Sequence, residues 1–350
     1  MPDIGKESNR ILDVKSLKMY FPVEKGVFKK LIGYVRAVDG VSFYINKGET
    51  LGLVGESGCG KSTVGKTLLR CLDATDGSIL YDLAGQGLVD ITGMHRKELK
   101  VRGFMKEAQM IFQDPYSSLD PRMTVLDIIS EPLVVNKVAR GQEAKERVEQ
   151  LMKVVGLDVK YLKRYPHAFS GGQRQRIGIA RALSTNPRFI VADEPTSALD
   201  VSIQAQILNL LKDLQDEFGL TYLFISHDLG VIDHMCDRVA IMYLGSLVES
   251  GPKENIFANP LHPYTEALLK SVPIADPDIV SGLESAPGEI GNPMNPPSGC
   301  YFHPRCGFAD GICKEEAPEL RELYPKHFVA CHYADVLALR GIATRRKSHA

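Results

Sequence analysis

The sequence predicts an α/β fold built on a parallel sheet, and three observations support this prediction. Short apolar runs with the composition of buried strands occur at Thr50–Val54, Phe189–Ala192, Leu220–Ile225 and Val239–Tyr243. Helical patterns separate them, most clearly at Ser62–Leu72 and Ser202–Phe218. The first run leads directly into a glycine-rich turn and then a helix. Strands that alternate with helices form parallel sheets whose faces the helices cover.

The composition is that of an ordinary globular protein of 350 residues. Hydrophobic residues make up 44% and charged residues 24%, and the formal net charge of −1 gives no overall attraction to nucleic acid. No apolar run approaches the roughly 20 residues of a membrane-spanning helix. The first ten residues lack the apolar centre of a signal peptide. We therefore expect a cytoplasmic protein that reaches a membrane only through a partner.

Two further regions extend the predicted sheet. Strands expected at Ile11–Val14 and Val41–Ile45 flank a basic, glycine-containing stretch, Glu24–Arg36, which we expect to form an elongated hairpin loop. Residues Val125–Val155 have a mostly helical pattern with Gly141 and Gly156 as interruptions. After Gly251 the character changes, and Pro and Gly accumulate through Pro287–Gly299 as in a linker.

Four of the seven cysteines crowd into the last fifth of the chain: Cys300, Cys306, Cys313 and Cys331. In a reducing compartment such clustering favours a metal site over disulfides. The spacing C-x5-C-x6-C-x17-C differs from the tight C-x2-C pair of most zinc ribbons. Four thiolates suit Zn²⁺ or an iron–sulfur cluster, and the looser spacing favours the cluster. Zinc and free thiols remain alternatives, and three histidines could replace a ligand: His303, His327 and His332.

Residues 55–63 form the glycine-rich turn between a predicted strand and a predicted helix. They are Gly55, Glu56, Ser57, Gly58, Cys59, Gly60, Lys61, Ser62 and Thr63, and they fit G-x-x-x-x-G-K-[ST]. The glycines let backbone N–H groups surround phosphates, and the helix N-terminus adds its positive end. Lys61 would place a cation on the β- and γ-phosphates, and the Ser62 hydroxyl would ligate Mg²⁺. The pattern predicts a nucleoside triphosphate site.

Asp193 and Glu194 end another predicted strand and supply the acidic partner that such a site needs. Asp193 can hold Mg²⁺ directly or through water. Glu194 can accept the proton of the attacking water as a general base.

A second anion-binding helix terminus follows Phe169, where Ser170, Gly171, Gly172 and Gln173 open a predicted helix that ends at Leu183. One nucleotide does not need two such sites from one chain, so the second is expected to face a nucleotide held by another subunit. Here the sequence resembles the ATP-binding-cassette (ABC) ATPases, a P-loop NTPase family whose signature reads LSGGQ, with Phe169 in place of the leucine. The resemblance covers about residues 11–335.

The resemblance implies further roles and a domain plan. Gln113 matches the glutamine that contacts Mg²⁺ and couples to a membrane partner, Asp200 ends the loop that crosses to the other subunit, and His227 matches the histidine at the γ-phosphate. We expect Phe21 to stack on adenine, with Tyr20 or Tyr34 as alternatives. The nucleotide-binding domain would span residues 11–251, with an antiparallel β subdomain and a helical signature subdomain at about 114–182. A small cysteine-rich extension (252–335) and a tail (336–350) would follow.

Within the family, this sequence is most similar to the peptide and nickel importers. The similar stretches are Asp114–Arg122, Asn259–Leu269 and the cysteine-rich end. Tyr20–Val23, followed by the basic insertion, resembles the second of their two ATPase subunits. The resemblance implies an ATP-hydrolysing motor for di- and oligopeptide import at the cytoplasmic face of the membrane, with a [4Fe–4S] centre at the four cysteines. Its partners would be two permease subunits, a second, non-identical ATPase and, indirectly, a solute-binding protein.

Other functions remain as alternatives. A nickel or other solute importer would use the same parts, and an exporter ATPase fits less well because exporters fuse membrane helices to the cassette. A DNA-repair ATPase would carry a long heptad coiled coil between Gln113 and Ser170, where only residues 114–169 lie. We therefore expect no nucleic-acid partner.

Overall fold

The computed structural model describes residues 9–271, 288–289 and 291–342, and these form two compact units. The first unit contains the described residues up to Asp13, together with Tyr44–Thr50 and Ile79–Ile225. The second contains Val14–Phe43, Leu51–Ser78 and the described residues from Ser226 onward. The predicted basic end of the tail, Arg345–Lys347, lies outside the described residues, as does Pro287 at the start of the predicted linker.

Parallel strands form the sheet of the first unit, in the order β8-β7-β6. Val191 of β7 lies opposite Met110 of β6 and Leu223 of β8. All five residues of β7 are buried, as expected of a parallel strand covered on both faces. The strands are β6 (Ala108–Ile111), β7 (Phe189–Asp193) and β8 (Thr221–Ser226). The predicted parallel α/β fold is confirmed here.

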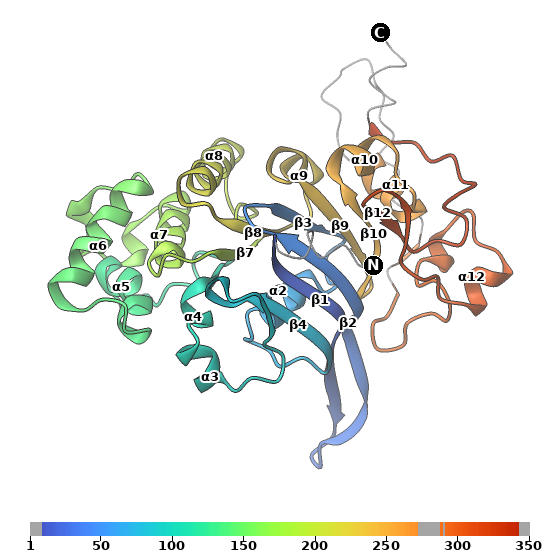
Figure 1. Cartoon of the computed structure of the whole chain (residues 1–350), viewed down its shortest axis with the longest axis horizontal. Helices are drawn as coiled ribbons and strands as arrows, with labels where there is room; N and C mark the ends of the chain where they lie inside the picture. Colours follow the sequence, from blue (N-terminus) through green and yellow to red (C-terminus); the bar gives the residue numbers. More distant parts are fainter. Residues whose placement is uncertain (1–8, 272–287, 290, 343–350) are drawn as a thin grey trace, which may run out of the picture. The chain divides into compact units, whose positions relative to one another are not determined.

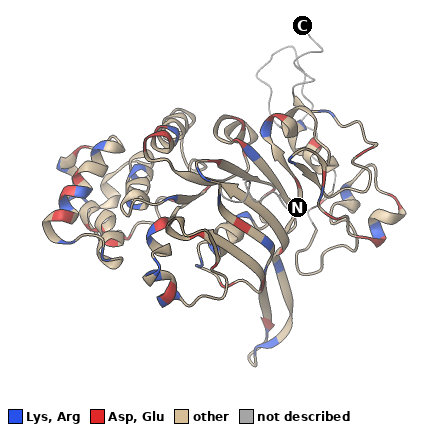
Figure 2. Ribbon diagram, viewed as in Figure 1, with Lys and Arg blue, Asp and Glu red and all other residues tan. Residues whose placement is uncertain are grey.

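Three helices of the first unit, α5 (Val125–Val135), α6 (Gly141–Val154) and α7 (Gly171–Leu183), pack against one another (Figure 1). The predicted helical stretch thus divides at residues 136–140, and Gly141 begins the second helix. Thr124 starts α5 through a reciprocal capping box with Asp127. Acidic and basic side chains alternate along α6 (Figure 2), where Lys145 and Glu149 form an ion pair of 3.8 Å. Its apolar face turns inward, and Val148 is fully buried.

The remaining elements of the first unit are short, apart from α8 (Val201–Phe218), which contacts α7. An antiparallel pair joins β4 (Asp76–Asp82) to β5 (Leu88–Asp90). The other helices are η1 (Leu83–Gly85), α3 (Arg96–Val101), α4 (Phe104–Glu107), η2 (Val159–Tyr161) and η3 (Pro166–Ala168).

The second unit contains a mixed sheet in the order β11-β12-β10-β9-β3. Only β3 and β9 are parallel, and the other neighbours are antiparallel. Its strands are β3 (Thr50–Val54), β9 (Arg238–Tyr243), β10 (Ser246–Pro252), β11 (Arg321–Tyr324) and β12 (His327–Val329). Its helices are α2 (Lys61–Leu68), α9 (Leu229–Met235), α10 (Lys253–Ala258), α11 (Pro263–Lys270), η4 (His303–Arg305) and α12 (Gly311–Glu315).

A hairpin is present at Glu24–Arg36 as predicted, but most of this stretch is strand and only residues 26–29 form the turn. β1 (Arg10–Lys25) and β2 (Lys30–Asn46) form a long ribbon (Figure 1). Gly26, with φ of 79°, makes the turn, and its carbonyl accepts a 3.1 Å bond from the Lys29 N–H. The strands continue because the run from Lys30 to Arg36 is rich in aliphatic and aromatic strand formers, which the basic composition obscured.

We predict that Val148→Ala destabilises the protein by about 2 kcal/mol, because it removes fully buried methyl groups and leaves a cavity. Val135→Ala is the matched control, since that side chain is 54% exposed at the end of α5. Urea unfolding followed by circular dichroism measures both. Equal shifts in the unfolding midpoint would show that α6 does not pack as described.

Candidate nucleotide-binding site

The phosphate loop connects β3 to α2 within the second unit. Lys61 is the first residue of α2, and its side chain is buried, at 5% exposure. Its Nζ donates to the carbonyl oxygens of Gly55 at 2.7 Å and Glu56 at 3.0 Å, so the ammonium group lies inside the curve of the loop. A buried cation within a ring of backbone is the expected arrangement for binding phosphate groups.

Gly60 is the residue that allows the loop to enter the helix. Its φ of 105° disfavours any other residue, and a Cβ there would clash with the carbonyl oxygen of Ala37. The next three residues begin α2, which starts one residue before the predicted position and ends at Leu68 instead of Leu72. Cys59, beside Gly60, is buried, and burial raises the pKa of its thiol. This thiol therefore stays neutral in the loop.

The acidic end of β7 belongs to the first unit. Asp193, its last residue, is buried at 4% exposure. Glu194 follows with φ of 44°, a left-handed conformation that is strained for a glutamate. The amide Nε2 of Gln113 donates to Glu194 Oε2 at 2.9 Å. The structure thus brings together Gln113 and Glu194, two predicted site residues 81 positions apart in the sequence.

The signature segment also lies in the first unit, at the start of α7. The Gln173 N–H donates to Ser170 Oγ at 3.4 Å, and the Ser170 N–H donates to Gln173 Oε1 at 3.1 Å, a reciprocal capping box. A Cβ on Gly172 would lie 2.5 Å from Cγ2 of Ile203 on α8. The glycine therefore allows the signature to pack closely against α8, whose N-cap residue is Asp200.

Phe169 explains how the signature tolerates its departure from leucine. Its ring is buried and packs edge-on against Tyr161, with centroids 5.7 Å apart. The position thus requires a large apolar side chain, which phenylalanine supplies as leucine would.

The predicted site residues are divided between the two units. Residues 55–63, Phe21 and His227 lie in the second unit, and the other residues predicted for the nucleotide site lie in the first. Phe21 is half-buried on β1, and His227 is exposed just after β8. The two alternatives for adenine stacking have different surroundings. The Tyr20 hydroxyl donates to Asp39, whereas the Tyr34 side chain is 48% exposed. The stacking role of Phe21 and a site joining both units stay predictions.

Sequence reasoning missed two residues that hold the phosphate loop, Tyr264 and Arg305. The Tyr264 hydroxyl oxygen accepts the Glu56 N–H at 2.9 Å. Arg305 donates from both terminal nitrogens to the Glu56 carboxylate, at 2.7 and 2.9 Å. Both residues are more than 200 positions from Glu56, so their contact with the loop could not be predicted, although Tyr264 falls within the importer-like stretch Asn259–Leu269.

Comparison with known proteins agrees with this geometry. A family model described as ABC transporter matches residues 38–197. The oligopeptide transport ATP-binding protein AppF of Bacillus subtilis (strain 168) is 53% identical over 92% of this chain and 97% of that protein. The chain belongs to the ATP-binding subunits of ABC transporters.

Further matches refine this family assignment. Residues 248–313 match the C-terminal region of oligopeptide/dipeptide transporters. The dipeptide transport ATP-binding protein DppF of Haemophilus influenzae is 47% identical over 94% of this chain and 98% of that protein. Among solved structures, this chain is similar to the ATP-binding cassette MJ0796 in a dimeric post-hydrolysis state bound to ADP and Pi. The TM-score is 0.60 at 28% identity, and the match covers 69% of this chain and 98% of the MJ0796 chain. The predicted recognition, fold and ATPase function are confirmed.

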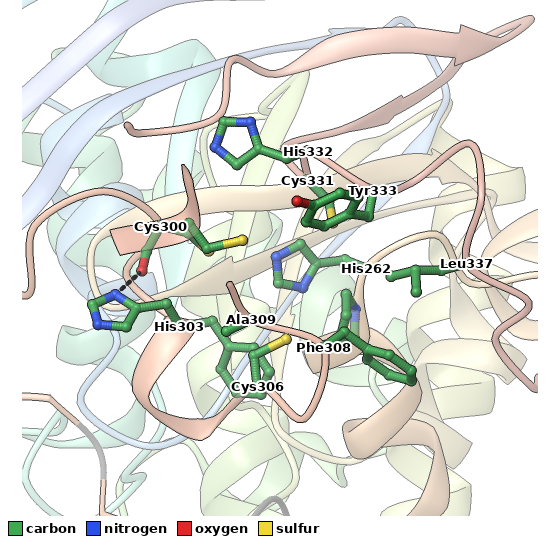
Figure 3. A pocket seen from close by; sticks show the side chains of 13 residues that line it. His262, Cys300, His303, Cys306, Phe308, Ala309, Cys331, His332, Tyr333 and Leu337 are labelled. Carbon is green, nitrogen blue, oxygen red and sulfur yellow. Dashed lines mark hydrogen bonds between the residues drawn. The ribbon is translucent and has the colours of Figure 1, made fainter. Parts of the chain in front are cut away.

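The four clustered cysteines of this ABC subunit line one pocket of the second unit (Figure 3). Phe302, Phe308 and Leu337 contribute apolar walls, and Cys313 is buried. Burial raises the pKa of Cys300 and of Cys331 to about 11, and the neighbouring thiols add to both shifts. Within the described part of the chain, no group of three or more His, Cys, Asp or Glu side chains is arranged to hold a metal ion.

None of the helices in residues 9–271, 288–289 and 291–342 combines the length and apolar character needed to cross a membrane. The described part of the predicted linker, residues 288–289 and 291–299, contains no helix or strand.

We predict that Lys61→Ala abolishes detectable ATP binding, because the phosphates lose the ammonium group inside the loop. Lys66→Ala is the matched control, since Lys66 lies on the same helix with its side chain exposed. Fluorescence titration with a labelled ATP analogue measures both variants. Retained binding by Lys61→Ala would show that the loop does not bind the phosphates.

Proposed function

We propose that this ABC subunit is the ATP-hydrolysing motor of an importer for di- and oligopeptides. The observation that carries the proposal is the match of residues 248–313 to the C-terminal region of oligopeptide/dipeptide transporters, in addition to the ABC match. The names of the relatives at 53% and 47% identity, which refer to oligopeptide and dipeptide transport, support the same substrate class. A nickel or other solute remains the alternative cargo.

In this proposal the loop at residues 55–63 holds the phosphates of ATP, and Phe21 stacks on adenine. The oxygen donors Ser62, Gln113 and Asp193 suit Mg²⁺, which prefers hydroxyl, amide and carboxylate oxygens. The ion would neutralise charge on the β- and γ-phosphates.

Glu194 accepts the proton from the attacking water as a general base, and His227 contacts the γ-phosphate. The hydrogen bond from Gln113 supports this role, because it holds the Glu194 carboxylate at the end of β7. The strained backbone of Glu194 also supports it, since such strain persists where the surrounding structure fixes a functional group.

We further propose that the chain works as a pair with a second, homologous ATPase subunit. Residues Ser170–Gln173 of one subunit, with Asp200 beside them, would face the nucleotide of the other. The exposed Ser170 at a helix N-terminus supports this proposal, as does the dimeric state given for the similar cassette MJ0796. The pair would bind two permease subunits at the cytoplasmic face of the membrane and receive solute through a solute-binding protein.

We predict that Glu194→Gln keeps ATP binding but slows hydrolysis about 10²- to 10⁴-fold, the usual contribution of a general base. Glu217→Gln, an exposed change on α8, is the control. The experiment uses the complex with its permeases in liposomes and follows phosphate release and uptake of a labelled tripeptide or of nickel. Undiminished turnover, with the partner's site also mutated, would contradict the role of Glu194. Nickel uptake without peptide uptake would contradict the proposed substrate.

Cys300, Cys306, Cys313 and Cys331 are also proposed to hold a metal centre, for which a [4Fe–4S] cluster is the first choice and Zn²⁺ the second. Their shared pocket supports the proposal, because four sulfur donors close together suit either group. As described, the side chains do not form a coordination sphere, so the thiols would have to turn toward one another. The centre would stabilise the pocket rather than take part in hydrolysis.

We predict that anaerobically purified protein contains iron and sulfide bound at these cysteines, and that Cys313→Ser lowers the content of both. Cys71→Ser is the matched control, since Cys71 is exposed and lies outside the pocket. Elemental analysis and the visible absorption spectrum measure the content. Stoichiometric zinc in colourless protein would identify the other metal, and protein with neither element would contradict a metal centre.

A further inference from the structure

We propose that Arg305 is a positioning residue of the phosphate loop, through which the C-terminal cysteine pocket sets the affinity for ATP. Arg305 and the loop belong to the same unit of the structure. The proposal does not depend on which solute is transported or on which metal binds.

Glu56, the second residue of the phosphate loop, is held at three separate points. Its carbonyl oxygen accepts from Lys61 at 3.0 Å, and its N–H donates to the Tyr264 hydroxyl at 2.9 Å. Its carboxylate receives two bonds from Arg305, at 2.7 and 2.9 Å. Tyr264 and Arg305 lie outside the loop, in the C-terminal part of the chain. Residues beyond the loop therefore help to hold its shape.

The Arg305–Glu56 pair has the geometry of a strong interaction. The two bonds are parallel and charge-assisted, and the guanidinium side chain is only 5% exposed. Removing one partner of such a pair leaves the other charge poorly compensated.

The charges of Glu56 and Arg305 should affect how tightly the loop binds the nucleotide. Glu56 places a carboxylate in a loop whose backbone binds phosphate, and this negative charge would repel ATP. Arg305 neutralises the carboxylate and holds it to one side. Loss of Arg305 should therefore weaken nucleotide binding both by repulsion and by loosening the loop.

Arg305 is in turn held by the cysteine pocket. It ends η4, a short turn in which the Arg305 N–H donates to Phe302 and the Cys306 N–H donates to His303. Cys300 and Cys306, on either side of this turn, both line the pocket. The Phe302 ring packs edge-on against Tyr243, with centroids 5.3 Å apart. A change in the pocket thus acts on Cys306, which directly follows Arg305, and on His303, two residues before it.

The proposal is tested by the nucleotide affinity of the full chain. This affinity is measured by titration with a fluorescent, non-hydrolysable ATP analogue. Arg305→Ala should weaken binding about ten-fold, the effect of losing one charged hydrogen-bond pair. In the assembled transporter the same variant should raise KM for ATP while kcat changes by less than about two-fold, because Arg305 touches neither substrate nor reacting atoms. Arg305→Lys should lie between, since lysine keeps the charge without the two-pronged contact. Arg321→Ala, which breaks the ion pair with Asp335 in the same unit, is the matched control and should bind normally.

Two double variants separate this role from simple destabilisation. Arg305→Ala should cost little affinity in a Glu56→Gln background, where no carboxylate is left to neutralise. Cys306→Ser should weaken binding in the wild-type background but have no further effect in Arg305→Ala.

Wild-type affinity in Arg305→Ala, or an equal loss in the Glu56→Gln background, would overturn the positioning role. A Cys306→Ser effect that persists without Arg305 would overturn the coupling to the pocket. If Arg305→Ala does not fold, Tyr264→Phe tests the same support, and unchanged affinity in it and in Arg305→Lys would overturn the proposal.

Discussion

The burial of one ammonium group among backbone carbonyls is the constraint on which the nucleotide site depends. Lys61 is almost completely enclosed, and it satisfies its charge with the carbonyl oxygens of Gly55 and Glu56. Burying a charge without such partners would cost roughly several kcal/mol. The loop must therefore curl around the lysine, and Gly60 permits this because it alone can take the required φ so close to Ala37.

Local and distant parts of the chain contribute differently to this loop. The glycines and Lys61 act within nine residues, so their pattern predicts the loop from the sequence. Arg305 and Tyr264 act across more than 200 positions, so neither the importer-like stretch around Tyr264 nor the cysteine-rich end around Arg305 indicates that they contact the loop. The same local rule applies to the helical region, where Gly141, expected as an interruption, directly follows the break at residues 136–140. Buried strands such as β7 were predicted correctly because continuous burial requires a continuous apolar run.

The first strand pair shows why a composition-based expectation can be wrong. Lysines and glycines in Glu24–Arg36 suggested a loop, yet only the turn at Gly26 departs from strand geometry. Exposed strands tolerate charged side chains on their solvent faces, so basic composition alone does not exclude a ribbon. At the cysteine cluster, sequence spacing predicted a metal centre; the four cysteines line one pocket, but the described residues show no arrangement of ligands for a metal ion. Spacing could not indicate how the sulfur atoms are oriented there, because rotamers depend on packing from Phe302 and Phe308.

Glu194, the proposed general base, combines a strained backbone with a side-chain contact that can be exchanged. Holding a glutamate at φ of 44° costs about 1–3 kcal/mol, so other contacts must compensate. The Glu194 backbone supplies them, because its N–H donates to Ile225 at 3.0 Å and its carbonyl accepts from Ser197 Oγ at 3.1 Å. The carboxylate, in contrast, takes its bond from Gln113, a side chain that also has an oxygen suited to Mg²⁺. A fixed backbone with a replaceable side-chain partner would let Glu194 keep its place while Gln113 responds to metal and nucleotide, as the proposed function requires.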